Sequence, residues 1–189
     1  SGTFEDILPE LTDGAVVDFE WFSPSVIMAI VDKGVETAVV KVTVDQKSMT
    51  EIVPFGKAIF RNVSLSSVGS TMAFSAHTPA HPPELYTWNA DAGLQRRTHH
   101  NDWLSEVAFG VQEVVNFKAR DGLDLQGILI RPVGEKKGRK VPLILMAHGG
   151  PESHYRNGWL TYYSWLGQMA AGKGYAVLYT NYRGSTGRG

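Results

Sequence analysis

The sequence predicts an all-β region followed by the beginning of an α/β region. Residues 11–103 show short segments of alternating apolar and polar residues, interrupted by Gly, Pro, Asp and Asn, which is typical of antiparallel β structure. Residues 141–179 contain two unbroken apolar runs separated by a helical pattern, which is typical of a parallel β-α-β unit. The pattern changes after Trp103, and we place the boundary between domains 1–108 and 109–189.

Composition excludes several classes of function. The 189 residues suffice for one ordinary domain or two small ones, and the net charge of −1 argues against nucleic acid or an anionic membrane as partner. The absence of cysteine excludes disulfides and thiolate metal sites. No apolar run approaches the length of a membrane span. A P-loop and a dinucleotide fingerprint are both missing from the sequence, so we expect no cofactor.

The all-β region contains two similar stretches. Residues 17–53 and 63–98 each predict four strands, and the two copies are offset by roughly 45 residues, the length of a four-stranded propeller blade. A blade cannot bury both of its faces alone, so blades occur in closed rings of about four to eight. We therefore predict two blades of a β-propeller; the alternative is a plain β-sandwich or meander.

A hairpin opens the second region. The alternating runs 111–117 and 123–130 are joined by Arg120-Asp121-Gly122, and Asp-Gly between such runs is typical of a hairpin turn. The basic stretch 134–140 that follows is interpreted as a solvated turn, because such runs seldom form binding patches.

The apolar run at residues 141–147 ends in His148-Gly149-Gly150-Pro151. Its length predicts a strand buried on both faces, and the glycines permit a tight turn. A helical pattern at 157–171 and a second apolar run at 175–179 follow. Strand, turn, helix and strand form a right-handed crossover of a parallel sheet, in which ligands bind at the carboxyl ends of the strands.

The polar stretch 181–189 directly follows the second of these strands. Two parallel strands are not stable by themselves, and two blades cannot close a ring. We therefore expect the sequence to be a fragment of a longer protein.

The glycine pair is the main candidate for chemistry. After a buried strand, Gly149 and Gly150 can direct backbone N–H groups at one point, where they would stabilise an oxyanion; losing one such donor typically costs about 10²–10³ in rate. The alternative is a turn without a function. His148 is interpreted as a packed or turn-stabilising residue in preference to a general base, which needs a nucleophile and an orienting acid.

Other candidates are weaker. No Gly-x-Ser-x-Gly elbow occurs in the sequence, and Ser185 directly follows a glycine, so we predict that Ser185 is a loop residue. His99 and His100 lack the spacing of metal ligands, and we expect no metal site.

Together these motifs resemble a known family. Residues 113–189 look like the start of the hydrolase domain of the prolyl oligopeptidase family of serine peptidases. The resemblance is carried by Arg120-Asp121-Gly122, by His148-Gly149-Gly150-Pro151 and by the stretch 181–187, Asn-Tyr-Arg-Gly-Ser-Thr-Gly. Residues upstream, including 84–98, are similar to the last two blades of that family's propeller.

The resemblance implies a β-propeller that caps an α/β-hydrolase domain, and hydrolysis of short peptides through an acyl-enzyme by a Ser-Asp-His triad. It places Gly150 in the oxyanion hole, with Gly149 as its neighbour, and puts the triad beyond Gly189. His148 stands where the prolyl-specific and dipeptidyl-peptidase branches have a tyrosine. A histidine at this position resembles the acylaminoacyl-peptidase and bacterial dipeptidyl-aminopeptidase branch. The chain alone would then be inactive.

Further expectations concern partners and place. Arg183 and Arg188 are expected near the cleft. A structural ion pair is the commoner fate of such an arginine, and Arg183 is, with His148, the candidate for binding a peptide carboxylate or carbonyl. We expect short peptides as partners and a cytoplasmic location, with a homo-oligomer, the periplasm and secretion left open. The alternative functions are a carboxylesterase or lipase-like α/β hydrolase and a non-catalytic propeller binding module.

Overall fold

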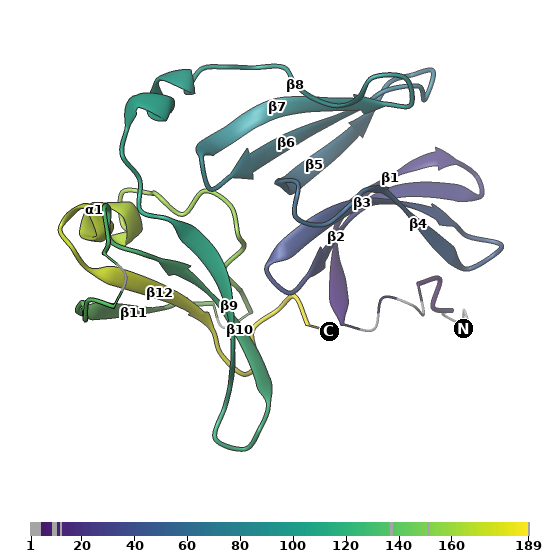
Figure 1. The fold of residues 1–189 in the computed structure, drawn as a ribbon. Helices are drawn as coiled ribbons and strands as arrows, with labels where there is room; N and C mark the ends of the chain where they lie inside the picture. The colour runs from purple at the N-terminus through teal and green to yellow at the C-terminus, as the bar shows by residue number, and fades with distance from the viewer. Residues whose placement is uncertain (1–4, 9–10, 12, 137, 151, 189) are drawn as a thin grey trace. The chain divides into compact units, whose positions relative to one another are not determined.

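The computed structural model describes residues 5–8, 11, 13–136, 138–150 and 152–188 and is composed mostly of β-sheet (Figure 1). The described residues form three four-stranded sheets. Contacts divide the chain into two compact units. Unit 1 comprises residues 1–76, 84–99 and 187–189, and unit 2 comprises residues 77–83 and 100–186.

The first sheet contains antiparallel strands in sequence order: β1 (Gly14–Ser23), β2 (Val26–Lys33), β3 (Glu36–Thr43) and β4 (Ser48–Val53). Its central strands β2 and β3 are buried along most of their length. Met28 and Ile30 of β2 pack in one apolar cluster, whereas Ile27, Ala29 and Val31 pack in another. Successive side chains of a strand point to opposite faces, so both faces of this sheet are covered.

The second sheet also follows the sequence order: β5 (Ile59–Leu65), β6 (Met72–Thr78), β7 (His81–Asn89) and β8 (Gly93–Arg96). In its core, the rings of Phe60 and Phe74 meet edge to face with centroids 5.4 Å apart. The β7–β8 turn is closed by the side chain of Asn89, which accepts hydrogen bonds from the N–H groups of Asp91 and Ala92 at 3.1 and 2.7 Å.

The two sheets confirm the predicted pair of four-stranded repeats. Their first strands begin at Gly14 and Ile59, which matches the predicted offset of about 45 residues. Three of the connections between their strands contain a glycine with positive φ, Gly34, Gly56 and Gly69, a conformation that glycine adopts without steric cost.

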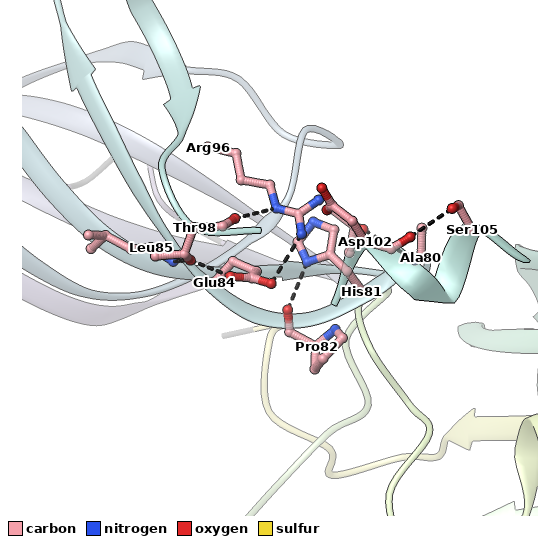
Figure 2. Close-up of polar contacts among 10 residues, drawn as sticks. Ala80, His81, Pro82, Glu84, Leu85, Arg96, Thr98, Asp102 and Ser105 are labelled. Atoms are coloured by element: carbon pink, nitrogen blue, oxygen red, sulfur yellow. Dashed lines mark hydrogen bonds and ion pairs between the residues drawn. The ribbon is translucent and has the colours of Figure 1, made fainter. Parts of the chain in front are cut away.

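A buried carboxylate fastens the β7–β8 hairpin of unit 1 (Figure 2). Glu84 is only 4% exposed, and its carboxylate accepts hydrogen bonds from Arg96 Nη2 at 3.1 Å and from the hydroxyl of Thr98. Arg96 Nε also donates to the Thr98 carbonyl at 2.9 Å, and the Thr98 hydroxyl accepts from the N–H of Leu85 at 2.9 Å. A buried charge is tolerated only when it is paired in this way.

The third sheet is mixed and belongs to unit 2. Its strands are β9 (Gln112–Lys118), β10 (Asp124–Ile130), β11 (Leu143–Ala147) and β12 (Ala176–Asn181), in the spatial order β11-β12-β10-β9. β9, β10 and β12 pair antiparallel, whereas β11 and β12 pair parallel (Figure 1). The hairpin at Asp121-Gly122 and the parallel pair predicted from the sequence are thus confirmed.

The prediction that β11 is buried on both faces is wrong. Within the described residues, β11 is an edge strand, and Leu143 and Leu145 on one of its faces are 57% and 62% exposed. Ile144 and Met146 on the other face are half-buried. A run of apolar residues has the same sequence pattern whether or not other parts of the chain cover both faces.

The helix predicted at residues 157–171 is also largely wrong, because only α1 (Gly167–Gly172) forms. The other helical element is the short 3₁₀ turn η1 (Asp102–Glu106). Some backbone groups at the start of the predicted helix bond to side chains: the C=O of Gly158 accepts from Gln112, and the N–H of Trp159 donates to His77 Nδ1 at 2.8 Å. These tertiary hydrogen bonds override the helical periodicity.

Helix α1 is held against the sheet by two polar contacts. Gln168 accepts from the N–H of Gly110 at 2.7 Å and donates to its C=O at 3.1 Å. The N–H of Gly167 donates to the hydroxyl of Tyr179 at 2.9 Å. Burial raises the pKa of Tyr179 to about 12, which keeps its hydroxyl neutral.

We predict that Glu84→Ala lowers the free energy of unfolding of unit 1 by about 2 kcal/mol, because it removes the buried acceptor of the Arg96 guanidinium and of the Thr98 hydroxyl. Glu84→Gln, which keeps a hydrogen-bond acceptor, should lose less. Urea unfolding followed by circular dichroism measures both. Glu51→Ala, at an exposed position of β4, is the control, and an equal effect of Glu84→Ala and Glu51→Ala would contradict the role assigned to the buried carboxylate.

Candidate active site

Two loops meet where the parallel strands β11 and β12 end. The register pairs Ala147 with Thr180, so the chain leaves both strands at the same edge of the sheet. His148-Gly149-Gly150 follows β11, and the stretch 182–186 follows β12. This is the carboxyl edge at which the sequence predicts a ligand site. Pro151, the last residue of the predicted motif, lies outside the described residues.

The glycine turn presents backbone N–H groups that form no hydrogen bond to any described residue. Gly149 and Gly150 are both exposed. A Cβ at Gly150 would lie 2.7 Å from the N atom of Glu152 and 3.3 Å from that of Ser153, whereas a Cβ at Gly149 would meet nothing within 4 Å. Gly150 is therefore required for the path of the chain, and the space beside Gly149 is open. Successive N–H groups of this kind can bind a negatively charged oxygen.

His148 is held from three sides. Its ring stacks on Tyr182 with centroids 4.4 Å apart and meets the ring of Tyr155 edge to face at 5.5 Å. Nε2 lies 2.7 Å from Ser185 Oγ, and Nδ1 lies 3.0 Å from the carbonyl oxygen of Gly149. The ring is half-buried, and each of its nitrogens has a hydrogen-bond partner, Nδ1 in the glycine turn and Nε2 in the loop after β12.

Ser185 and Tyr182 were not singled out from the sequence as partners of His148. Ser185 does lie in a loop, as predicted, but its hydroxyl donates to the carbonyl of Tyr182 at 2.7 Å and its oxygen lies 2.7 Å from His148 Nε2. The Tyr182 hydroxyl donates to the carbonyl of His148 at 2.8 Å. The parallel pairing of β11 and β12 could have predicted these contacts, because it places the loops that follow the two strands at the same edge of the sheet.

The last residue of β12 and the loop after it also hold the segment that follows the glycine turn. The buried side chain of Asn181 accepts from the N–H of Tyr155 at 2.8 Å and donates to its C=O at 2.9 Å. The N–H of Thr186 donates to the C=O of Ser153 at 3.0 Å, and the Thr186 hydroxyl lies 2.7 Å from His154 Nδ1. The chain is thus fastened on both sides of Gly149 and Gly150.

An aromatic cluster supports this edge of the sheet. The ring of Tyr155 contacts Tyr179 at 4.8 Å and Trp165 at 5.4 Å, both edge to face. Burial raises the pKa of Tyr155 as well as that of Tyr179. These rings give the loops a rigid apolar base, because packed aromatic pairs add to the stabilisation from buried area.

Arg183, the predicted substrate-binding arginine, forms an ion pair with Asp121 in the β9–β10 turn. Both side chains are exposed. The N–H of Leu123 lowers the pKa of the Asp121 carboxyl most, and the charge of Arg183 lowers it further. Arg183 therefore forms a structural ion pair, the fate that the sequence analysis set against substrate binding.

The described part of the chain contains no group of three or more His, Asp or Glu side chains placed to hold a metal ion. None of its helices has the length and apolar character needed to cross a bilayer.

We predict that Arg183→Gln raises the pKa of Asp121 only part of the way towards its ordinary value of 3.8, because the N–H of Leu123 remains. A carboxyl whose pKa is lowered by folding contributes stability above that ordinary value and loses it as the pH falls through the folded pKa. An NMR titration of the carboxyl carbon measures the shift. Arg139→Gln, an exposed arginine, is the control; an unchanged Asp121 pKa in Arg183→Gln would contradict the ion pair.

Comparison with known proteins identifies relatives. No family model matches the chain. It is 34% identical over 134 residues to the uncharacterized peptidase YuxL of Bacillus subtilis, which covers 70% of this chain and 20% of that protein. It is 43% identical over 68 residues to the acylamino-acid-releasing enzyme of Sus scrofa, which covers 36% of this chain and 9% of the enzyme.

Solved structures agree with these relatives. An acylaminoacyl peptidase in complex with Z-Gly-Gly-Phe-chloromethyl ketone matches 93% of this chain and 26% of its own, with a TM-score of 0.73 and 26% identity. The chain spans about a fifth of the length of the Bacillus protein and about a quarter of the solved chain. These similarities confirm the resemblance inferred from the sequence: the chain is homologous to acylaminoacyl and dipeptidyl peptidases of the prolyl oligopeptidase family.

Proposed function

We propose that the protein containing this chain is a serine peptidase that hydrolyses short peptides through an acyl-enzyme, and that Gly149 and Gly150 supply part of its oxyanion hole. The observation that carries the proposal is the pair of exposed glycines whose N–H groups form no bond to the described residues, at the carboxyl edge of two parallel strands. The names of the relatives support it, since they are peptidases and one was solved with a peptide ketone.

The fold assignment belongs to the same proposal. The sheets β1–β4 and β5–β8 would be two blades of a β-propeller, and β9–β12 the first part of an α/β-hydrolase sheet, with the domains divided between residues 108 and 109. The repeat of four-stranded antiparallel sheets supports the first assignment. The change from antiparallel to parallel pairing supports the second.

In the proposed reaction, a serine hydroxyl attacks the carbonyl carbon of the peptide bond and negative charge develops on the carbonyl oxygen. Backbone N–H groups already fixed in position stabilise this charge without reorganising when it forms. Gly149 and Gly150 would act at this step. No nucleophile elbow occurs in the sequence, so the attacking serine would be supplied by residues outside the chain.

His148 bears on the class of substrate. In its place a tyrosine would present a hydroxyl, whereas the imidazole is packed between two tyrosine rings with both nitrogens engaged. We therefore favour peptides with an acylated amino terminus, of the kind named for the acylamino-acid-releasing relative, over prolyl substrates. A fluorogenic series of acyl-aminoacyl, dipeptidyl and prolyl anilides ranks these, and a simple ester tests the alternative of a carboxylesterase.

The nucleophile is located by a fluorophosphonate probe, which labels activated serines. We predict that the protein in its natural length is labelled and that the 189-residue chain expressed alone is not. Labelling at Ser185 of the short chain would contradict the assignment, because it would make the Ser185–His148 contact a catalytic pair. Absence of label on the natural-length protein would contradict the peptidase.

The oxyanion turn is tested by Gly150→Ala. We predict a decrease in kcat of about 10² with KM nearly unchanged, because the new Cβ collides with the backbone N of Glu152 and displaces the donors. Gly172→Ala is the matched control, since a Cβ there meets nothing within 4 Å. Kinetics on a peptide anilide measure the effect of the displaced turn. The thermal midpoint of unfolding, recorded for both variants, shows whether folding itself is impaired. Equal kcat in both variants would contradict the proposal.

A further inference from the structure

A hollow of about 360 Å³ lies at the edge of the third sheet where the parallel strands β11 and β12 begin. One of its walls is the connection from β10 to β11, and the other is the turn between α1 and β12. Each of these segments leads directly into one of the two parallel strands. The hollow and the glycine turn therefore lie at opposite edges of the sheet.

Backbone hydrogen bonds fasten the two walls together. The N–H of Val133 donates to the C=O of Ala171 at 3.1 Å, and the N–H of Ala176 donates to the C=O of Pro142 at 2.9 Å. The first bond joins the β10–β11 connection to the end of α1, and the second joins it to the start of β12. The walls are thus held by the backbone near both ends of this connection.

Four basic side chains line the hollow, three from the first wall and one from the second: Lys136, Arg139, Lys140 and Lys173. All four residues are exposed, and none of them forms an ion pair with another described residue. Glu135, the acidic residue of the lining, is paired with Arg131 at 3.4 Å. The hollow therefore gathers positive charge that the described residues do not neutralise.

The structural roles usual for such residues do not account for this charge. Basic side chains after a helix often bind its last carbonyl groups. Here the C=O groups of Ala170 and Ala171 already accept hydrogen bonds from the backbone N–H groups of residues 173–175. The interpretation of residues 134–140 as a solvated turn considered that run by itself, whereas the fold adds Lys173 from a distant part of the chain. Like charges gathered around one hollow repel one another, and a bound anion would offset this repulsion.

The size and lining of the hollow indicate the class of ligand. Its volume is in the range of small-molecule sites, and most of the remaining lining is apolar: Pro132, Val133, Val141, Pro142 and Tyr175. Lysine and arginine side chains are the usual protein ligands of phosphate groups. One phosphate group carries a charge of about −2 at neutral pH, so two linked phosphates match the four cations better than one does.

We propose that this hollow binds a small molecule that carries at least two linked phosphate groups, with the phosphates held by the four basic side chains. The apolar part of the lining would contact the rest of the molecule. The proposal is independent of the proposed peptidase function, because it rests on residues at the other edge of the sheet and its test measures binding alone.

Isothermal titration calorimetry of the natural-length protein, with pyrophosphate as the probe, tests the site. We expect one pyrophosphate per chain to bind with a Kd on the order of 0.1 mM at low salt, and about tenfold more weakly in 0.5 M salt, because salt screens exposed charges. Orthophosphate should bind about tenfold more weakly than pyrophosphate. Lys173→Gln and Arg139→Gln should each raise the Kd about fivefold, since each removes one charged phosphate contact. Lys173→Arg, which keeps the charge, should stay within about twofold of the original.

Arg120→Gln is the matched control. It removes one exposed positive charge from the β9–β10 turn, which lies at the other end of β10 from the hollow. Circular dichroism of each variant checks that it is folded. Equal Kd values for Lys173→Gln, Arg139→Gln and Arg120→Gln would overturn the proposal. Binding that does not saturate would overturn it too, because it would show only a general attraction of anions to the surface.

Discussion

The parallel pairing of β11 with β12 is the constraint on which the candidate site depends. Its register runs from Leu143 opposite Ala176 to Ala147 opposite Thr180 and brings together two loops that are far apart in sequence. A shift of one residue would turn every side chain of a strand to the opposite face. His148 would then leave the aromatic rings that hold it.

The irregular segment between the glycine turn and α1 follows from the same edge. Asn181, the last residue of β12, uses both ends of its amide on the backbone of Tyr155, as a neighbouring strand would. The buried amide of Asn181 needs both a donor and an acceptor, and the N–H and C=O of Tyr155 supply them. The chain passes across the end of β12, where the ring of Tyr155 meets the imidazole of His148 edge to face.

Sequence patterns predicted the parts of this structure that depend on neighbouring residues. Alternating segments, Asp121-Gly122 and the glycines after residue 148 mark the strands, the hairpin and the turn, because local backbone preferences determine these features. The exposure of Leu143 and Leu145, the loss of most of the helix and the contact of Ser185 with His148 depend on which distant segments are adjacent. Periodicity carries no information about that, so the prediction failed or was silent there.

The Ser185–His148 contact resembles a nucleophile and its base, and its surroundings decide against that role. A catalytic imidazole is oriented at Nδ1 by a carboxylate, which stabilises the positive charge that appears when the ring takes a proton. Here Nδ1 faces the carbonyl of Gly149, a neutral group. The serine hydroxyl also donates its single proton to the carbonyl of Tyr182 at 2.7 Å, so this proton is directed away from the imidazole. The pair therefore lacks both a serine proton directed at the ring and the carboxylate that would stabilise a protonated ring.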